Sequence, residues 1–353
     1  MNWSDLLGHQ AQIQMLFQAV RRNRLPHALL FGGPAGIGKH TIALLFARSL
    51  LCEKSTDDDL EACGSCSSCR SFDAGNHPDC LTVGLPAGKG IIPIASIAGE
   101  GEDRGRSGLC YDLSLRPMLS RRKVAIVDDA DCMNAEAANA FLKTLEEPTP
   151  DTIIILVSSQ PDALLPTIRS RCQLLRFHPL QTQDVAELLL RLEWVDDRKM
   201  AEEIAALSEG SLYQGAQLLD PRWRDLKTLL WNGLASASID VGKLSAALIE
   251  HIESKSADAG EKKHAWNWLL RFAVEYYRGL LADLSRQMSE ELSMGQISDV
   301  SSELWWKLEN ANLLLERCLD EELRRDDNLN MTLTLEAWLA ELSQMQKQTP
   351  AAT

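Results

Sequence analysis

A glycine-rich segment that follows a short apolar run limits the folds open to this chain. The segment reads Gly33-Pro-Ala-Gly-Ile-Gly-Lys-His40, and the run before it is Ala28-Leu-Leu-Phe31. A helix is predicted over 41–51, so the glycines lie between a strand and a helix N-terminus. In that setting backbone N–H groups can surround phosphate oxygens, and Lys39 can reach the outer phosphates of a nucleotide. The segment therefore predicts a P-loop in an α/β fold.

Two further apolar runs predict the rest of a parallel sheet. They are Val124-Ala-Ile-Val127 and Ile153-Ile-Ile-Leu-Val157, and both are continuously apolar, as strands buried on two faces should be. A second helix is predicted over 135–147, with Asn134 as its N-cap and Pro148 after its end. Strands that alternate with helices in this way indicate a parallel α/β sheet.

The pattern of the chain predicts three domains. Residues 1–179 carry the α/β pattern, 180–220 form a small helical unit, and 221–353 are helical with heptad-like apolar spacing. Most tryptophans lie beyond residue 220, and we interpret them as helix-packing residues because few basic residues interleave with them, as base stacking would require. The glycine-rich stretch 86–109 is predicted to be a surface loop.

Charge and hydropathy narrow the classes of function. The formal net charge is −14, whereas a chain that grips DNA alone through its phosphates is expected to be basic. DNA contact is therefore expected to be local or shared with partners. No apolar run approaches the roughly 20 residues that cross a bilayer, and the first residues lack the regions of a signal peptide. We expect a cytoplasmic protein with no membrane partner and with reduced cysteines.

Four of the nine cysteines have the spacing of a metal site. Cys52, Cys63, Cys66 and Cys69 read C-x10-C-x2-C-x2-C. Four thiolates suit a tetrahedral Zn²⁺ ion and leave no coordination position open for catalysis, so a structural zinc module is predicted over 52–69. Free thiols are the alternative. The other cysteines have no such spacing and are interpreted as packing residues.

Acidic residues follow the run that ends at Val127. Asp128 is placed to hold the Mg²⁺ of a bound nucleotide, as in a Walker B strand, and Asp129 to activate water. Asp129 is one methylene shorter than the Glu of active ATPases, and His40 stands where a P-loop has the Ser or Thr that ligates Mg²⁺. Thr41 cannot replace that residue because it points about 100° away around the helix. We expect little or no ATP hydrolysis and leave open whether ATP and Mg²⁺ bind.

Two longer stretches resemble a known family. They read Ala137-Ala-Asn-Ala-Phe-Leu-Lys-Thr-Leu-Glu-Glu-Pro148 and Pro166-Thr-Ile-Arg-Ser-Arg171-Cys172. Both resemble the clamp-loader family of AAA+ proteins, which in bacteria are subunits of the DNA polymerase III holoenzyme and load a sliding clamp onto primed DNA. The resemblance implies an AAA+ P-loop domain with an inserted zinc module, then a helical lid domain and an all-α collar domain.

The resemblance also implies roles for single residues. The arginine of the Ser-Arg-Cys motif is an arginine finger that acts in trans on a neighbouring subunit, and this role falls on Arg171. A polar sensor residue falls on Ser159. With these, the candidate nucleotide-binding residues are Gly33, Gly36, Gly38, Lys39, His40, Thr41, Asp128, Asp129 and Ser159.

Two kinds of clamp-loader subunit are open to the chain. One is a non-motor subunit that supplies its arginine finger, and the other is an ATP-hydrolysing motor of the gamma/tau type. His40, Asp129 and the lack of an arginine in 210–216, where motor subunits carry a sensor arginine, favour the non-motor kind. The implied partners are the gamma/tau and delta subunits in a hetero-oligomer, with primed DNA and the clamp contacted through the complex. A stand-alone zinc-bearing nucleic-acid-binding protein is disfavoured by the charge.

Overall fold

The computed structural model describes residues 2–57, 59–86, 89–236, 238–255, 259–293, 302–323 and 330–347. The chain divides into two compact units, Met1–Ala216 and Gln217–Thr353, and each is described by itself. The first unit includes both the α/β part and the small helical unit, so a domain boundary near residue 180 stays a prediction.

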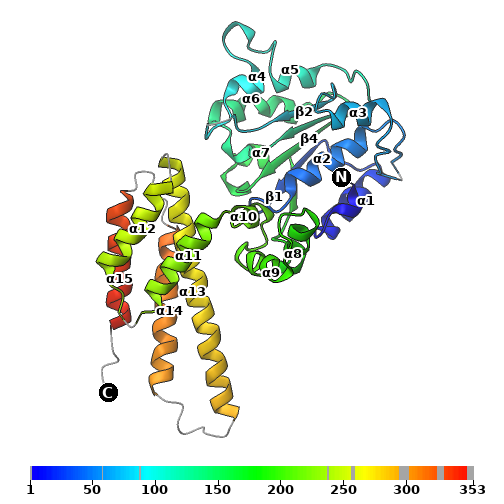
Figure 1. Ribbon diagram of the computed structural model, residues 1–353. Coiled ribbons are helices and arrows are strands. Elements are labelled where there is room, and N and C mark those ends of the chain that lie inside the picture. Colours follow the sequence, from blue (N-terminus) through cyan, green and yellow to red (C-terminus); the bar gives the residue numbers. More distant parts are fainter. Residues whose placement is uncertain are drawn as a thin grey trace. The chain divides into compact units, whose positions relative to one another are not determined.

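The first unit is built on a five-stranded parallel sheet in the order β2-β3-β4-β1-β5. Figure 1 labels β1, β2 and β4 of this sheet among the helices that surround it. The strands are β1 (Ala28–Gly32), β2 (Cys80–Val83), β3 (Lys123–Val127), β4 (Thr152–Ser158) and β5 (Gln173–Arg176). The three apolar runs of the sequence are the central strands β3, β4 and β1, in which every residue is buried. The edge strands β2 and β5 are shorter and partly exposed. The predicted parallel α/β fold is confirmed.

Helices cover both faces of the sheet. On one face lie α1 (Gln10–Arg21) and α2 (Lys39–Leu51), around a core that includes Phe31 and Phe46. On the other face lie α4 (Ile94–Ala98), α5 (Leu109–Ser114), α6 (Ala135–Glu146) and α7 (Pro166–Arg169), around Phe141 and Ile154. The predicted N-cap of α6 is confirmed, because the Asn134 side chain accepts a hydrogen bond from the backbone N–H of Ala137 at 2.8 Å.

Shorter elements complete the first unit. The helix α3 (Ser67–Asp73) follows the cysteine-rich segment, and four single turns of 3-10 helix lie at η1 (Trp3–Asp5), η2 (Gly101–Asp103), η3 (Ala130–Cys132) and η4 (Pro161–Ala163). The last three helices are α8 (Thr182–Arg191), α9 (Arg198–Leu207) and α10 (Leu212–Gln217). They correspond to the small helical unit of the sequence.

The stretch 86–109 differs from its prediction. Among its described residues it contains α4 and η2, and the side chains of Ile92 and Ile97 are fully buried in the core against α6. Ile92 also forms an isolated parallel bridge with Met133. The prediction of a plain surface loop is therefore wrong. The stretch contains an apolar run, Ile91-Ile-Pro-Ile-Ala-Ser-Ile97, whose buried isoleucines anchor a short helix in the core. Residues 87 and 88 lie outside the described residues.

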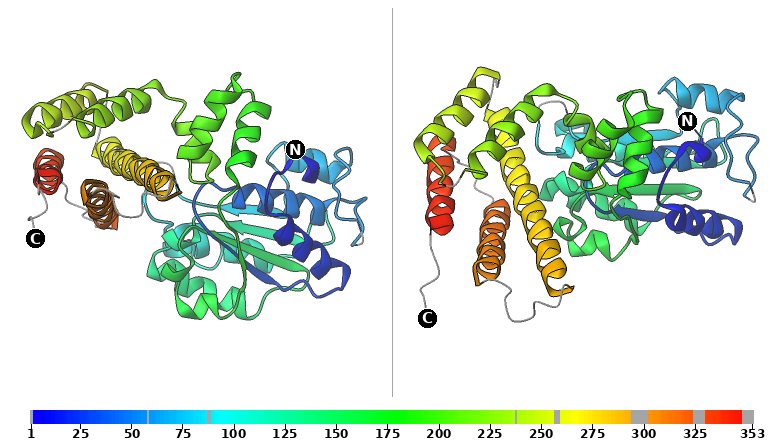
Figure 2. Two further views of the ribbon diagram at one scale, coloured as in Figure 1. Left: turned by 90° about the horizontal axis from the view of Figure 1, so that it is seen from below. Right: turned by 60° about the horizontal axis from the view of Figure 1, so that its bottom comes forward.

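The second unit consists of helices. They are α11 (Pro221–Leu234), α12 (Val241–Lys255), α13 (Ala259–Ser293), α14 (Ser302–Leu323) and α15 (Met331–Lys347), and α13 and α14 run side by side (Figures 1 and 2). Trp266 packs edge-on against Trp338 with ring centres 5.6 Å apart, and both are buried. Helix packing thus explains these tryptophans, whereas Trp305 is 57% exposed. Within the described residues, we find no helix that combines the length and the apolar character needed to cross a membrane.

Candidate functional site

The predicted nucleotide-binding residues meet at the carboxyl edge of the sheet. A cavity of about 780 Å³ is lined by residues of the loop after β1, of the loop after β3 and of the end of β4. Its lining includes Gly36, Gly38, Lys39, His40, Thr41, Asp128, Asp129 and Ser159. The carboxyl ends of parallel strands are where α/β proteins place ligands. Of the predicted set only Gly33 lies outside this lining, and its carbonyl is a partner of Lys39.

The P-loop lysine has its hydrogen bonds within the loop itself. Lys39 Nζ donates to the carbonyl oxygens of Gly33 at 2.7 Å and of Pro34 at 2.6 Å, and the residue is only 5% exposed. Burial lowers the pKa of Lys39, although the nearby Asp128 acts in the opposite direction. An arriving phosphate would therefore have to compete with two carbonyl oxygens for this ammonium group.

His40 binds the carboxylate that was expected to hold Mg²⁺. Its Nδ1 lies 3.0 Å from Oδ2 of Asp128. The hydrogen bond to Asp128 raises the pKa of His40, which outweighs the effect of burial. Burial acts to raise the pKa of Asp128, yet the hydrogen bond from His40 and its charge hold that pKa below its ordinary value. His40, which stands where a P-loop has its hydroxyl ligand for Mg²⁺, is therefore also the partner of Asp128, the other predicted ligand.

Asp129 and Ser159 both interact with a further acidic residue, Asp131. Burial first, and then the charges of Asp128 and Asp131, raise the pKa of Asp129. The hydroxyl of Ser159 donates to Oδ2 of Asp131 at 3.0 Å, and its backbone N–H lies 3.2 Å from Oδ1. Sequence reasoning had assigned no role to Asp131. The predicted sensor serine is thus bonded to a third acid that lies beside the Walker B pair.

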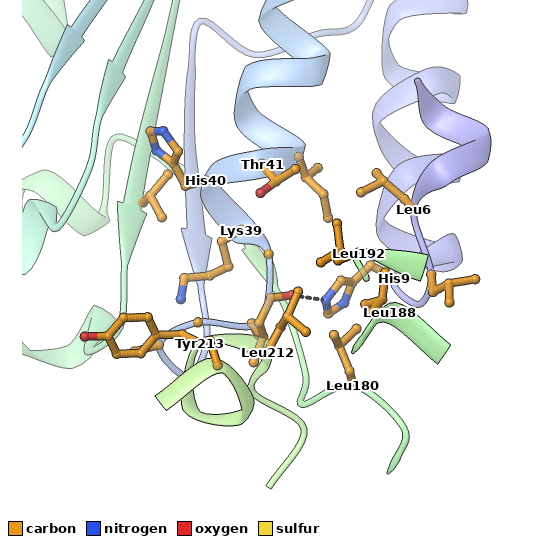
Figure 3. A pocket seen from close by; sticks show the side chains of 18 of the residues that line it. Leu6, His9, Lys39, His40, Thr41, Leu180, Leu188, Leu192, Leu212 and Tyr213 are labelled. Atoms are coloured by element: carbon orange, nitrogen blue, oxygen red, sulfur yellow. Dashed lines mark hydrogen bonds between the residues drawn. The ribbon is translucent and has the colours of Figure 1, made fainter. Parts of the chain in front are cut away.

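One half of the cavity is apolar, and the sequence did not predict it. Leu6 from the N-terminal segment, Leu188 from α8 and Leu192 directly after α8 gather on the side away from His40 (Figure 3). His9 lies among them, and its Nε2 is 2.8 Å from the carbonyl oxygen of Ile37. The i, i+4 spacing of Leu188 and Leu192 indicates an apolar helix face, but it does not indicate which residues that face contacts.

The helix α10 closes against the P-loop. A Cβ atom at Gly36 would lie 2.4 Å from both the Ser211 Oγ and the Tyr213 Cβ, and Gly36 has a positive φ of 74°. The backbone N–H of Tyr213 contacts the Gly36 carbonyl oxygen at 3.4 Å. Only glycine fits here, because both its conformation and its surroundings exclude a side chain.

Arg171 lies near the amino-terminal ends of the strands, whereas the P-loop lies at their carboxyl ends. It precedes β5, whose residue Gln173 pairs with Leu29 near the start of β1, whereas the P-loop follows the end of β1. Five strand residues span roughly 17 Å, so this side chain cannot reach its own P-loop. Its guanidinium is 34% exposed and lies 2.6 Å from Oε1 of Glu146. It also donates to the Thr167 carbonyl oxygen at 2.9 Å.

The four predicted cysteines come together between α2 and α3. The sulfur atoms of Cys52, Cys63, Cys66 and Cys69 all lie within 4.8 Å of one another, and those of Cys52 and Cys66 are 3.9 Å apart. A tetrahedral zinc with Zn–S bonds of about 2.3 Å places its sulfurs roughly 3.8 Å apart. Hydrogen bonds from Ser65 lower the pKa of Cys63 to about 5. The donor set and its spacing fit a zinc ion.

The chain is similar in sequence to known subunits of DNA polymerase III. A family described as "DNA polymerase III, delta subunit" matches residues 8–181. DNA polymerase III subunit delta' of Yersinia pestis is 32% identical over 286 residues, which cover 79% of this chain and 78% of that protein. The corresponding subunit of Bacillus subtilis is 38% identical over 190 residues, so the chain spans about half (54%) of its length. Subunit tau of Bacillus subtilis is 30% identical over 247 residues, which cover 70% of this chain and 40% of tau.

A similar solved structure is a gamma subunit-related protein of Thermotoga maritima, at 19% identity and a TM-score of 0.38 over 95% of this chain and 100% of that one.

Proposed function

The chain belongs to the family of DNA polymerase III delta-prime subunits, and on that premise we propose that it is a non-motor subunit of a clamp loader. In this role it helps to load the sliding clamp onto primed DNA together with gamma/tau and delta subunits in the cytoplasm. The observation that carries the non-motor role is the contact of His40 with Asp128 at 3.0 Å. His40 and Asp128 stand at the two positions through which a motor subunit would bind Mg²⁺, and here they contact each other.

The alternative is an ATP-hydrolysing motor, which the similarity to subunit tau keeps open. Three features of the first unit speak against it. His40 brings no hydroxyl to a metal ion, Lys39 is bonded to its own loop, and the place of a sensor arginine is taken by Ser211 and Tyr213, which pack against Gly36. We propose that the isolated chain turns over ATP at a negligible rate. Turnover at the rate of a motor subunit, abolished by Lys39→Ala, would favour the alternative.

We further propose that Arg171 is an arginine finger that acts in trans. Because Arg171 cannot reach its own P-loop, a nucleotide that it contacts would have to be bound by another chain. The guanidinium lines an open cavity of about 550 Å³ with His27, Glu146 and Ser170. A fixed cation of this kind stabilises the negative charge that develops on a transferring phosphoryl group.

Structural zinc and a collar complete the proposal. The four cysteines would hold the ion and leave no position for a substrate, so the metal would serve the folding of its module. The helical second unit would join the chain to its partners, and large apolar side chains that remain exposed on it fit this role: Trp305, Leu313 and Leu333.

The test of the finger uses reconstituted clamp loaders. A trans arginine finger can be worth roughly 10³–10⁵ in rate at its own site, so Arg171→Ala should silence one ATP site and cause a partial loss of ATPase and clamp loading. Arg171→Lys should fail as well, because one ammonium group cannot replace the planar fork. The matched control is Arg169→Ala, two residues away, whose guanidinium pairs with Asp162 at 2.8 Å.

Each reconstitution is checked for stoichiometric incorporation of the variant by co-purification with the gamma/tau and delta subunits. Wild-type ATPase and clamp loading with either Arg171 variant would leave Arg171 a structural residue. Failure of the wild-type chain to co-purify with these subunits would contradict the clamp-loader role itself.

A further inference from the structure

A buried polar cluster lies between the four-cysteine site and an exposed turn of the chain. Its members are Ser68, His77, Asp79 and Ser120, of which Ser68 is 1% and Asp79 0% exposed. None of them belongs to the P-loop cavity or to the Ser-Arg-Cys motif. Because buried polar groups are costly unless they are hydrogen-bonded, their bonds fix the segments that carry them.

Ser68 and Leu51 join the cluster to the cysteines. Ser68 lies between Cys66 and Cys69 in the first turn of α3, and its hydroxyl donates to the Leu51 carbonyl oxygen at 2.6 Å. Leu51 directly precedes Cys52, and the Cys66 sulfur caps α3 by accepting the Cys69 N–H at 3.3 Å. A metal ion that holds these sulfurs therefore also fixes the Ser68 hydroxyl and the Leu51 carbonyl.

The turn at residues 118–120 is held by two members of the cluster. The Asp79 carboxylate accepts the backbone N–H groups of Met118 at 2.6 Å, Leu119 at 2.7 Å and Ser120 at 2.7 Å. The Ser120 hydroxyl donates to the Leu51 carbonyl oxygen at 2.8 Å, beside the bond from Ser68. Met118 is 81% and Leu119 40% exposed, so the buried contacts hold two apolar side chains at the surface.

His77 connects both sides. Its Nδ1 accepts the Asp79 N–H at 3.0 Å, so the neutral ring carries its proton on Nε2. Nε2 lies 2.9 Å from the Ser68 hydroxyl and 3.3 Å from that of Ser120. Burial lowers the pKa of His77, which favours this neutral ring. One side chain thus contacts both the exposed turn and α3, which contains Cys69 and is capped by Cys66.

We propose that the metal ion held by the four cysteines positions the exposed turn 118–120 through Ser68, His77 and Ser120. The inference rests on the metal site proposed above and is independent of the clamp-loader role. The module then has a task beyond its own folding, because it sets the conformation of a surface segment about fifty residues further along the chain. Loss of the metal releases Ser68 and Leu51, and with them the hydroxyl anchor of the turn.

The test is hydrogen–deuterium exchange of the full chain, read in a peptide that covers residues 117–121. Losing one hydrogen bond worth about 1 kcal/mol corresponds to roughly fivefold faster exchange, and we expect at least this change after removal of zinc by a chelator. Exchange in β1 and β4 should stay unchanged. Ser120→Ala should speed exchange in the same peptide while the chain keeps its zinc.

Ser67→Ala is the matched control. Ser67 lies in the same turn of α3 as Ser68, but it is exposed and its hydroxyl bonds to Glu53. We expect wild-type exchange in this variant. Unchanged exchange in the turn after zinc removal, or in Ser120→Ala, would overturn the proposed coupling. If removal of zinc also speeds exchange in β1 and β4, the chain has loosened as a whole. The coupling is then judged from the exchange of the turn in Ser120→Ala.

The metal content of the purified chain is measured first. A chain that binds no metal overturns both the metal site and the coupling. Clamp loading is measured in separate reconstitutions, so failure of the coupling leaves the proposed function standing.

Discussion

The P-loop cavity and the four-cysteine site are both places where the sequence predicts a bound ion, yet their donors are arranged differently. At the P-loop, Lys39 is bonded to two carbonyl oxygens of its own loop and His40 is paired with Asp128. At the other site, four sulfurs converge within 4.8 Å. At the first site each charged group faces a partner of opposite charge or a carbonyl oxygen, whereas the thiolates of the second site repel one another unless a cation binds between them.

The difference bears on the proposal that the chain does not act as a motor. At the P-loop, Lys39 and Asp128 each have a partner within the chain. The cysteine sulfurs also accept hydrogen bonds, from the N–H groups of Cys63 and Cys69, but these bonds do not offset the repulsion between four ionised sulfurs. We therefore expect the free energy of folding to depend strongly on metal in one region and weakly on nucleotide in the other.

The largest effect is expected at the cysteines. Metal binding to sites of this kind contributes on the order of 10 kcal/mol to folding, so Cys66→Ser should lose the ion and loosen the segment from Cys52 to α3. The measurement is zinc per chain together with limited proteolysis. Cys110→Ser, in α5 and outside the cluster, is the control that should keep the metal. Absence of zinc from the wild-type chain, with all four thiols freely titratable, would remove the contrast between the two sites.

A smaller effect is expected when the P-loop is given back its hydroxyl. His40→Thr frees Asp128 and restores a magnesium ligand, so ATP with Mg²⁺ should stabilise this variant, by about 2.7 kcal/mol at one hundred times the Kd. The wild-type chain should show no such gain in its unfolding temperature. His40→Ala separates the two causes, since it frees Asp128 but offers no hydroxyl. Equal stabilisation of the wild-type chain by ATP with Mg²⁺ would show that the contact of His40 with Asp128 does not prevent binding.

The smallest effect is expected from pH. The raised pKa of His40 gives stability that is complete below its unfolded value near 6.5 and is lost as pH rises through the folded pKa. The lowered pKa of Asp128 gives stability that is present above about 3.9 and is lost as pH falls through the folded pKa. The pair is therefore most stabilising between these limits.

Because the His40 side chain is 37% exposed, solvent screening should keep the change in unfolding free energy between pH 6 and pH 8 below about 1 kcal/mol. Urea unfolding at both values measures it. His40→Gln, which cannot titrate, should lack the part of this change that the wild-type chain owes to His40. The same pH dependence in both proteins would assign it to other groups.

The sequence predicted the central strands and the meeting of distant residues, for clear physical reasons. β1, β3 and β4 are buried on both faces, so their residues must be apolar throughout. The P-loop and the acids of the Walker B strand follow parallel strands, whose carboxyl ends share one edge. Cysteine spacing is a local signal, and the structure indeed brings the four sulfurs together.

Other features depend on contacts that no local pattern encodes. The edge strands β2 and β5 have four residues each and are partly exposed, so they lack an apolar signature. The apolar half of the cavity joins Leu6 to Leu188, which are far apart in the chain. The pairing of His40 with Asp128 could be suspected from the missing hydroxyl, but their distance could not.

The close contact of Gly36 with Ser211 and Tyr213 has a mechanical consequence. In motor proteins of this general kind, the angle between a nucleotide-binding part and its helical lid follows the ligand. Here α10 and the residue before it pack directly on the loop, with no room for even a methyl group at Gly36. We therefore expect this packing to restrict how far the angle can change. A subunit built in this way would act in an assembly as a fixed frame of reference against which moving neighbours do work.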